Sequence, residues 1–208
     1  MSAWIEELIT QGWLKTPKII EAFKKIKRVD FLPEGLKHLA NLNTALPIGY
    51  GQTISQPLVV AFMLELLEPK EGEKILDIGA GSGWTTALLA YIVTSKEKKG
   101  KVIAIELVPQ LIDFCKKNIK NYDFIEKGIV QIVLGDGTKG YLKEAPFDKI
   151  LVSAEAKKCY LTWKEQLKVG GKIVTPIKNS IWLFEKKSET EFFQKEYPGF
   201  AFVPLIET

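Results

Sequence analysis

The second half of the chain alternates short apolar segments with helical ones, and this alternation limits the fold more than any other feature. Four apolar segments with the length of buried strands lie at residues 74–79, 101–106, 129–134 and 147–153. The helical segments between and after them are expected at residues 84–93, 109–121 and 158–167. Strands that alternate with helices predict a mostly parallel sheet of the α/β class, with helices on both faces.

The remaining strands are expected to differ in direction. Two apolar segments follow each other closely at residues 170–176 and 180–185, which predicts an antiparallel hairpin at one edge of the sheet. Another apolar segment, 201–205, is expected to be the last strand. The sequence therefore predicts seven strands.

The N-terminal part is helical and ends in a loop. Apolar residues keep helical spacing in three segments, at residues 4–9, 19–26 and 34–40. A loop rich in glycine and proline follows at 47–57, and Ser55 is expected to cap the helix after it.

The length of 208 residues predicts a single domain over residues 1–208. Within it, residues 1–57 are expected to supply extra N-terminal helices and a loop beside a functional site. Residues 58–208 are expected to form the α/β core.

The composition limits the chemistry. The chain has one histidine, His38, and two cysteines, Cys115 and Cys159. A structural zinc site needs about four nitrogen or sulfur ligands, so no metal site is expected. A Ser-His-Asp triad would have to use His38. Two cysteines far apart in sequence indicate reduced thiols, which predicts a cytoplasmic protein.

The charged residues and the apolar runs argue against two kinds of partner. Lys and Arg together number 29 and Asp and Glu 25, but Arg28 is the only arginine. Arginine is the usual side chain for reading phosphates and guanine edges, so no nucleic-acid partner is expected. No apolar run approaches the ~20 residues that cross a bilayer, so no membrane partner is expected either.

A glycine turn follows the first strand of the core, in the segment Asp77-Ile-Gly79-Ala-Gly81-Ser-Gly83. Glycines let the backbone turn sharply and approach a ligand, and the following helix offers free N–H groups. The spacing differs from the G-x-G-x-x-G of dinucleotide sites. Asp77 would repel a diphosphate but suits a cofactor with an ammonium group, such as S-adenosylmethionine.

Two more strand ends carry acidic residues. Glu106 ends the second strand, where a carboxylate can accept hydrogen bonds from both ribose hydroxyls, and Asp136 follows the third, where it can accept from an adenine amino group. Ligands of open α/β sheets bind at these carboxyl ends. The alternative is a tight strand-to-helix turn without a ligand.

The chain resembles the protein-L-isoaspartate O-methyltransferase family nearly from end to end. The glycine turn is generic to enzymes that use S-adenosylmethionine, whereas Gly51-Gln-Thr-Ile-Ser-Gln-Pro57 and Phe202-Val-Pro-Leu205 are specific to this family. The other segments that carry the resemblance are residues 28–33, 46–50, 135–137, 145–148 and 165–171.

The resemblance implies a Rossmann-like seven-stranded sheet and methyl transfer from S-adenosylmethionine to the free carboxylate of L-isoaspartyl residues in damaged proteins and peptides. It implies Ser55 as the catalytic residue, with Gln52, Thr53, Ile54 and Ser55 as substrate-binding residues. It implies cofactor binding by Asp77, Gly79, Gly81, Ser82, Gly83, Glu106, Leu107, Asp136 and Gly137. A monomer is expected.

One stretch departs from the family pattern. After the fourth strand the family has small residues and prolines, whereas this chain has Glu155, Lys157, Lys158 and Tyr160, with Trp163 in place of a leucine. Two alternatives therefore stay open. One is a methyltransferase of the same fold with a different carboxylate acceptor, and the other is a catalytically silent module that only binds the cofactor.

Overall fold

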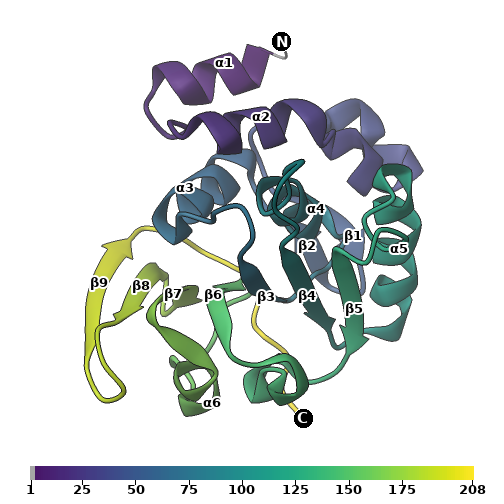
Figure 1. The fold of residues 1–208 in the computed structure, drawn as a ribbon. Coiled ribbons are helices and arrows are strands. Elements are labelled where there is room, and N and C mark those ends of the chain that lie inside the picture. Colours follow the sequence, from purple (N-terminus) through teal and green to yellow (C-terminus); the bar gives the residue numbers. More distant parts are fainter. Residues whose placement is uncertain (1–2) are drawn as a thin grey trace.

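The computed structural model describes residues 3–208 (Figure 1). Its α-helices are α1 (Ala3–Thr10), α2 (Pro17–Lys25), α3 (Pro57–Leu67), α4 (Trp84–Ile92), α5 (Pro109–Ile119) and α6 (Leu161–Glu165). Its short 3-10 helices are η1 (Arg28–Phe31), η2 (Glu34–Leu39), η3 (Lys120–Tyr122), η4 (Gly137–Lys139) and η5 (Leu142–Glu144). Its strands are β1 (Leu46–Gly49), β2 (Gln52–Ile54), β3 (Lys74–Ile78), β4 (Lys101–Glu106), β5 (Val130–Leu134), β6 (Phe147–Val152), β7 (Leu167–Ile177), β8 (Ser180–Lys186) and β9 (Phe192–Pro198).

Seven strands form one sheet in the order β5-β4-β3-β6-β7-β8-β9. Strands β3 to β7 pair in parallel. Strand β8 pairs antiparallel with both of its neighbours, so it is the one described strand of this sheet that runs against the others. These pairings confirm the predicted mostly parallel sheet with an antiparallel hairpin at one edge.

The prediction of a last strand at 201–205 was wrong. The seventh strand is β9, and 201–205 is an extended segment that makes only an isolated bridge, between Glu155 and Pro204. Strand β9 lies at the edge of the sheet and is exposed through its middle, so polar residues at 194–196 hide it from a search for apolar segments. The 201–205 segment is apolar for another reason, because its residues line two neighbouring pockets.

The sheet has a core on each face. Helices α3, α4 and α5 pack over one face, in the cluster that contains Ile75, Val102 and Leu151, whereas α2 packs on α3 and α4, and α1 packs on α2 (Figure 1). Helix α6 packs over the other face, where Trp163 joins Leu76 in a second cluster. Side chains alternate between the faces of a strand, which is why Ile75 and Leu76 belong to different clusters. The expected helices on both faces and the extra N-terminal helices are both present.

The loop expected at 47–57 contains a small hairpin. Strands β1 and β2 pair antiparallel, with Leu46 opposite Ile54. The prediction that Ser55 caps the next helix was wrong. The N-cap residue of α3 is Gln56, and its side chain makes no hydrogen bond to the end of the helix. The amide of Leu58 instead donates a hydrogen bond to the side-chain oxygen of Asn43 at 3.0 Å.

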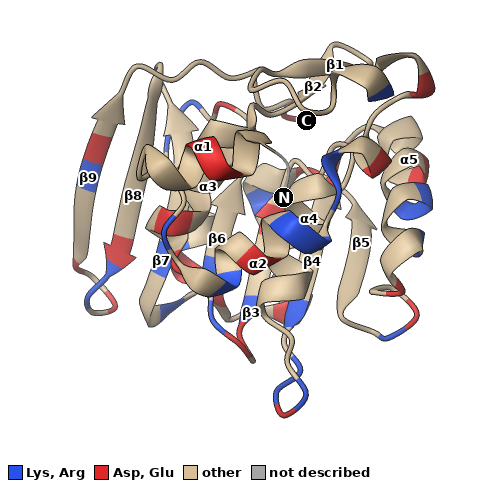
Figure 2. Ribbon diagram, turned by 90° about the horizontal axis from the view of Figure 1, so that it is seen from above, with Lys and Arg blue, Asp and Glu red and all other residues tan. Residues whose placement is uncertain are grey.

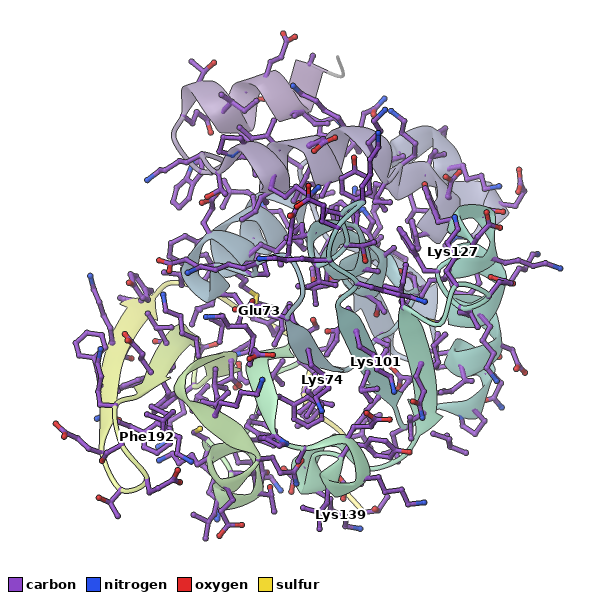
Figure 3. The ribbon with its side chains drawn as sticks, in the orientation of Figure 1. Glu73, Lys74, Lys101, Lys127, Lys139 and Phe192 are labelled. Carbon is purple, nitrogen blue, oxygen red and sulfur yellow. The ribbon has the colours of Figure 1, made fainter. Side chains whose placement is uncertain are left out.

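Basic and acidic residues are interspersed along the chain (Figure 2). Glu73, Lys74 and Lys101 gather at the amino-terminal ends of β3 and β4, and Lys139 lies apart from them (Figure 3). Among residues 3–208, no helix is both long and apolar enough to cross a membrane. The same residues contain no cluster of three or more side chains suited to a metal ion.

Candidate active site

The turn from β3 into α4 requires glycine at three positions. Gly79, Gly81 and Gly83 have φ angles of +80°, +53° and +89°, a region that other residues rarely adopt. The amides of Gly79 and Ala80 donate to the carbonyl of Ile105 at 2.9 and 3.0 Å. The turn is therefore fixed to the end of β4, and it leaves space above the carboxyl ends of the strands.

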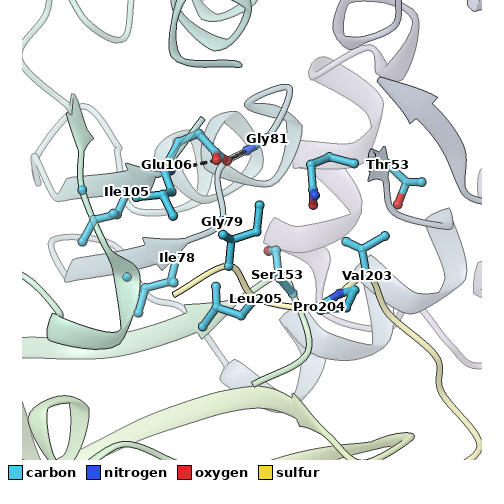
Figure 4. A pocket seen from close by; sticks show the side chains of 16 residues that line it. Thr53, Ile78, Gly79, Gly81, Ile105, Glu106, Ser153, Val203, Pro204 and Leu205 are labelled. Atoms are coloured by element: carbon cyan, nitrogen blue, oxygen red, sulfur yellow. Dashed lines mark hydrogen bonds between the residues drawn. The ribbon is translucent and has the colours of Figure 1, made fainter. Parts of the chain in front are cut away.

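That space is a pocket, which we call the cofactor pocket (Figure 4). Of the predicted cofactor-binding residues it contains Gly79, Gly81, Glu106, Leu107 and Gly137, and it also contains Gln52 and Thr53, which were predicted to bind the substrate. Sequence reasoning missed its apolar wall, which is formed by Ile78, Ile105, Leu205 and Ile206. The apolar residues at the ends of the predicted strands were the available clue. The pocket thus combines a polar glycine turn with an apolar wall.

Glu106 connects the turn to the end of β4. One oxygen of its carboxylate accepts a hydrogen bond from the amide of Gly81 at 2.8 Å. The other accepts from the amides of Leu107 and Val108 at 2.8 and 3.0 Å. A carboxylate oxygen has two lone pairs, so the Gly81-bound oxygen can still accept from a ligand hydroxyl.

Asp77 lies behind the turn and does not line the cofactor pocket. Its side chain is fully buried and accepts a hydrogen bond from the hydroxyl of Thr86 at 2.7 Å. Its other oxygen has no partner among the described residues. Burial raises the pKa of Asp77 to about 7, and the nearby Glu106 carboxylate adds to this effect.

Two other predicted residues also support the turn from behind. Ser82 is buried, and its carbonyl accepts a hydrogen bond from the side chain of Asn118 at 2.9 Å. A Cβ atom at Gly83 would lie 2.8 Å from the sulfur of Cys115. Only glycine therefore lets α5 pack this closely against the turn.

Asp136 lies at the end of β5, between two glycines that line the cofactor pocket. One of its oxygens accepts from the amide and hydroxyl of Thr138, at 2.9 and 2.7 Å. The other accepts from the amide and hydroxyl of Thr208, at 3.3 and 3.2 Å. Burial tends to raise the pKa of Asp136, but the bonds from Thr138 and Thr208 outweigh it and the pKa is lowered.

A second pocket, which we call the acceptor pocket, lies beside the first and is lined by Ser55. Thr53, Ser153 and Val203, which Figure 4 shows in the cofactor pocket, also line the acceptor pocket and form a wall shared by the two. No charged side chain is found among the described residues that line the acceptor pocket. Ile54, which was expected here, is instead part of the core and only 4% exposed.

The only arginine holds the loop that carries Ser55. The guanidinium of Arg28 is buried and donates to the carbonyls of Ala40, Leu42, Thr44 and Ser55, at 3.2, 3.0, 2.7 and 3.3 Å. Burial lowers its pKa to about 10, so it remains charged at neutral pH. Sequence reasoning missed this role, although a single arginine in a lysine-rich chain was a signal.

The chemistry of the cofactor pocket fits a cationic ligand. Glu106 is the sole charged side chain among the described residues that line the pocket. A dinucleotide would bring its diphosphate next to this carboxylate, and no lining Lys or Arg is described there to balance it. S-adenosylmethionine carries an ammonium and a sulfonium, and its adenine suits the apolar wall. The residues present therefore fit this cofactor.

A Rossmann-like sheet in which β8 alone runs antiparallel, with a glycine turn after the first core strand and a pocket whose only described charged lining residue is Glu106, fits a class I S-adenosylmethionine-dependent methyltransferase. Comparison with known proteins gives the particular family. Residues 1–208 match the family described as protein-L-isoaspartate(D-aspartate) O-methyltransferase. The chain belongs to this family.

Individual relatives agree with the family match. A protein-L-isoaspartate O-methyltransferase of Methanopyrus kandleri is 43% identical over 97% of this chain and 89% of that protein. The protein-L-isoaspartate O-methyltransferase 2 of Archaeoglobus fulgidus is 44% identical over 97% of this chain and 90% of its own length. A Plasmodium falciparum protein assigned as a protein-L-isoaspartate O-methyltransferase, in complex with S-adenosyl-L-homocysteine, shares the fold, with a TM-score of 0.89. The two chains are 24% identical, and the match covers 100% of this chain and 98% of that one.

Proposed function

We propose that this protein transfers a methyl group from S-adenosylmethionine to the free carboxylate of L-isoaspartyl residues in damaged proteins and peptides. The observation that carries the proposal is the shared wall of Thr53, Ser153 and Val203. Because the two pockets meet at this wall, S-adenosylmethionine in the cofactor pocket and an acceptor carboxylate beside Ser55 would lie next to each other. The family membership supports the choice of donor and acceptor.

The residues of the cofactor pocket have distinct roles in this proposal. Glu106 would accept hydrogen bonds from the ribose hydroxyls, and Gly79 and Gly81 would let the backbone approach the ligand. Ile105 and Leu205 would contact the adenine ring, next to Gly137. The cofactor supplies an electrophilic methyl group on a sulfonium. Asp77 would act from behind the turn, through the field of its carboxylate.

The acceptor needs orientation more than activation. A carboxylate with a pKa of about 4 is already ionised at neutral pH, so no general base is required. The hydroxyl of Ser55 would donate a hydrogen bond to one acceptor oxygen, and Gln52 and Thr53 would contact the neighbouring peptide. Holding two reactants in line can contribute roughly 7–11 kcal/mol to lowering a barrier. Arg28 would serve this alignment by fixing the backbone at Ser55.

The test is incubation with labelled S-adenosylmethionine and two peptides that differ only in an isoaspartyl or aspartyl residue. Methyl transfer to the isoaspartyl peptide alone is expected. Cofactor binding without transfer to either peptide would favour a different carboxylate acceptor. If a wider set of small acids and peptides also stays unmethylated, the protein is a binding module rather than an enzyme.

We further propose that the protein acts as a monomer in the cytoplasm. Two free thiols, Cys115 and Cys159, support a reducing compartment. Light scattering coupled to gel filtration would test the monomer, and a mass of twice 23.4 kDa would contradict it.

A further inference from the structure

The 203–208 segment forms part of the outer wall of the cofactor pocket, and the loop after β6 holds it there. Residues 203–206 all line the pocket. The amide of Glu155 donates to the carbonyl of Val203, and the amide of Leu205 donates to the carbonyl of Glu155, both at 2.8 Å. The segment is thus attached along its first half by main-chain hydrogen bonds.

Side chains of the same loop hold the second half. The hydroxyl of Tyr160 donates to one carboxylate oxygen of Glu207 at 2.5 Å. The ammonium of Lys157 lies 3.2 Å from the other oxygen. Both oxygens of Glu207 are therefore paired with residues of the loop. These contacts are partly exposed to solvent, so each is weak enough to break and reform.

Tyr160 also links the segment to the loop after β5. Its ring packs edge to face against Trp163, with ring centroids 4.9 Å apart. The indole N–H of Trp163 donates to the carbonyl of Gly137 at 2.7 Å. Thr208 completes the connection, because its amide and hydroxyl bond the carboxylate of Asp136. Segment and loop thus enclose the pocket between them.

The residues involved are those that depart from the family pattern. Lys157, Tyr160 and Trp163 replace small residues, proline or leucine in the sequence. None of the three lines the acceptor pocket, where Ser153 alone represents the stretch 153–163 among the described residues. Their side chains instead contact the 203–208 segment or the loop after β5. The departures therefore concern how the cofactor pocket is closed.

We propose that Lys157, Tyr160 and Glu207 are positioning residues that hold 203–208 as a clasp over the cofactor pocket, and that the clasp must open for S-adenosylmethionine to enter and S-adenosylhomocysteine to leave. This inference rests on the cofactor site of the proposed function. Opening would release Asp136 from Thr208, so that its second oxygen keeps only the exposed Lys139, at 3.5 Å, among its described partners and can accept from the entering ligand.

The first experiment measures the release rate of S-adenosylhomocysteine by stopped flow for Tyr160→Phe, Glu207→Gln and the double variant. Loss of one hydrogen bond is expected to speed release by roughly two- to tenfold. The double variant should release faster than either single variant, because Tyr160→Phe removes the tyrosine hydrogen bond, whereas Glu207→Gln removes the ion pair with Lys157 and leaves an amide oxygen that can still accept from Tyr160. Tyr197→Phe is the matched control, since the Tyr197 hydroxyl makes no hydrogen bond to any described residue. The thermal midpoint of each variant should stay near that of the wild type.

The second experiment follows amide hydrogen exchange of residues 203–208 in the ligand-free protein. Exchange there should rise in Tyr160→Phe and Glu207→Gln and stay unchanged in Tyr197→Phe. Release or exchange at wild-type rates in both clasp variants would overturn the inference. Failure of the wild type to bind S-adenosylhomocysteine would instead contradict the proposed function, and the exchange measurement would still decide whether the three residues hold the segment.

Discussion

The cofactor pocket and the acceptor pocket are built in different ways. The cofactor pocket rests on strand ends and a glycine turn, whose main-chain geometry follows from the local sequence. The acceptor pocket rests on a hairpin loop whose position depends on Arg28, through contacts that span 12 to 27 residues. The acceptor site can therefore be altered at Arg28 without touching any residue that lines it, whereas the turn of the cofactor site is fixed by its own lining residues Gly81 and Glu106.

The largest effect is expected from Asp77→Asn. This change tests how far ionisation of the buried carboxyl behind the cofactor pocket lowers the free energy of unfolding. Its carboxyl ionises near pH 4 in the unfolded chain but, because burial raises its pKa, near pH 7 in the folded protein. Between these values the unfolded state binds fewer protons, so the free energy of unfolding falls as pH rises. The fall from this one group is roughly 3–4 kcal/mol. In Asp77→Asn, urea unfolding should show a flatter dependence on pH between 4 and 7.

A matched control for Asp77 is Asp113→Asn on the exposed side of α5, which should keep the wild-type slope. Asp77→Asn is also expected to weaken binding of S-adenosylhomocysteine, as measured by calorimetry. A wild-type pH slope in Asp77→Asn would contradict the raised pKa.

Glu106→Ala is expected to have the next largest effect, and on the cofactor side alone. The change removes the acceptor for three backbone amides and for the ribose. Affinity for S-adenosylhomocysteine should fall by about 30- to 100-fold, or roughly 2–3 kcal/mol. Calorimetric titration measures it, with the exposed Glu126→Ala as control. An affinity within twofold of wild type would remove Glu106 from the cofactor site.

Arg28→Lys tests the support of the acceptor pocket. A lysine keeps the charge but lacks the planar fork that reaches several carbonyls at once. The kcat/KM for an isoaspartyl peptide should fall about tenfold or more, while the affinity for S-adenosylhomocysteine changes by less than about threefold. Lys25→Arg on the surface of α2 serves as the control. Equal losses of both quantities would show that the two pockets are not independently supported.

Ser55→Ala is expected to have the smallest effect of the four. The loop and its anchor stay in place, because Arg28 contacts the carbonyl of Ser55 and not its side chain. Removing one orienting hydrogen bond should lower kcat about fivefold, with cofactor binding unchanged. Steady-state kinetics with an isoaspartyl peptide measure it, alongside Ser188→Ala in the distant β8–β9 turn. An unaltered kcat would exclude Ser55 from the reaction.

The sequence predicted the parallel strands of the sheet well, but it missed the edge strand β9 and the β1–β2 hairpin. Strands β3 and β4 are buried on both faces and read as continuous apolar segments. Strand β9 is an edge strand that faces solvent, and its polar middle gives no apolar pattern. The β1–β2 hairpin was missed because its turn uses Tyr50 at a φ of +56° between two glycines, which sequence alone reads as irregular loop.

The site was predictable where main-chain geometry places it and less so where side-chain direction matters. Gly79, Glu106 and Gly137 lie at strand ends and line the cofactor pocket as expected. Asp77 lies within β3, so its side chain points into the layer of helix α4 and not toward the ligand. The role of Arg28 depends on carbonyls that only the folded chain brings together, so no sequence motif could locate its partners.

The way Arg28 holds its loop has a consequence for altering this protein. All four of its acceptors are main-chain oxygens, so the anchor does not depend on which side chains the loop carries. Positions such as Ala45 and Gln56, which line the acceptor pocket, can be randomised in a library while the loop stays in place. The loop is therefore a natural starting point for directed evolution toward new acceptors.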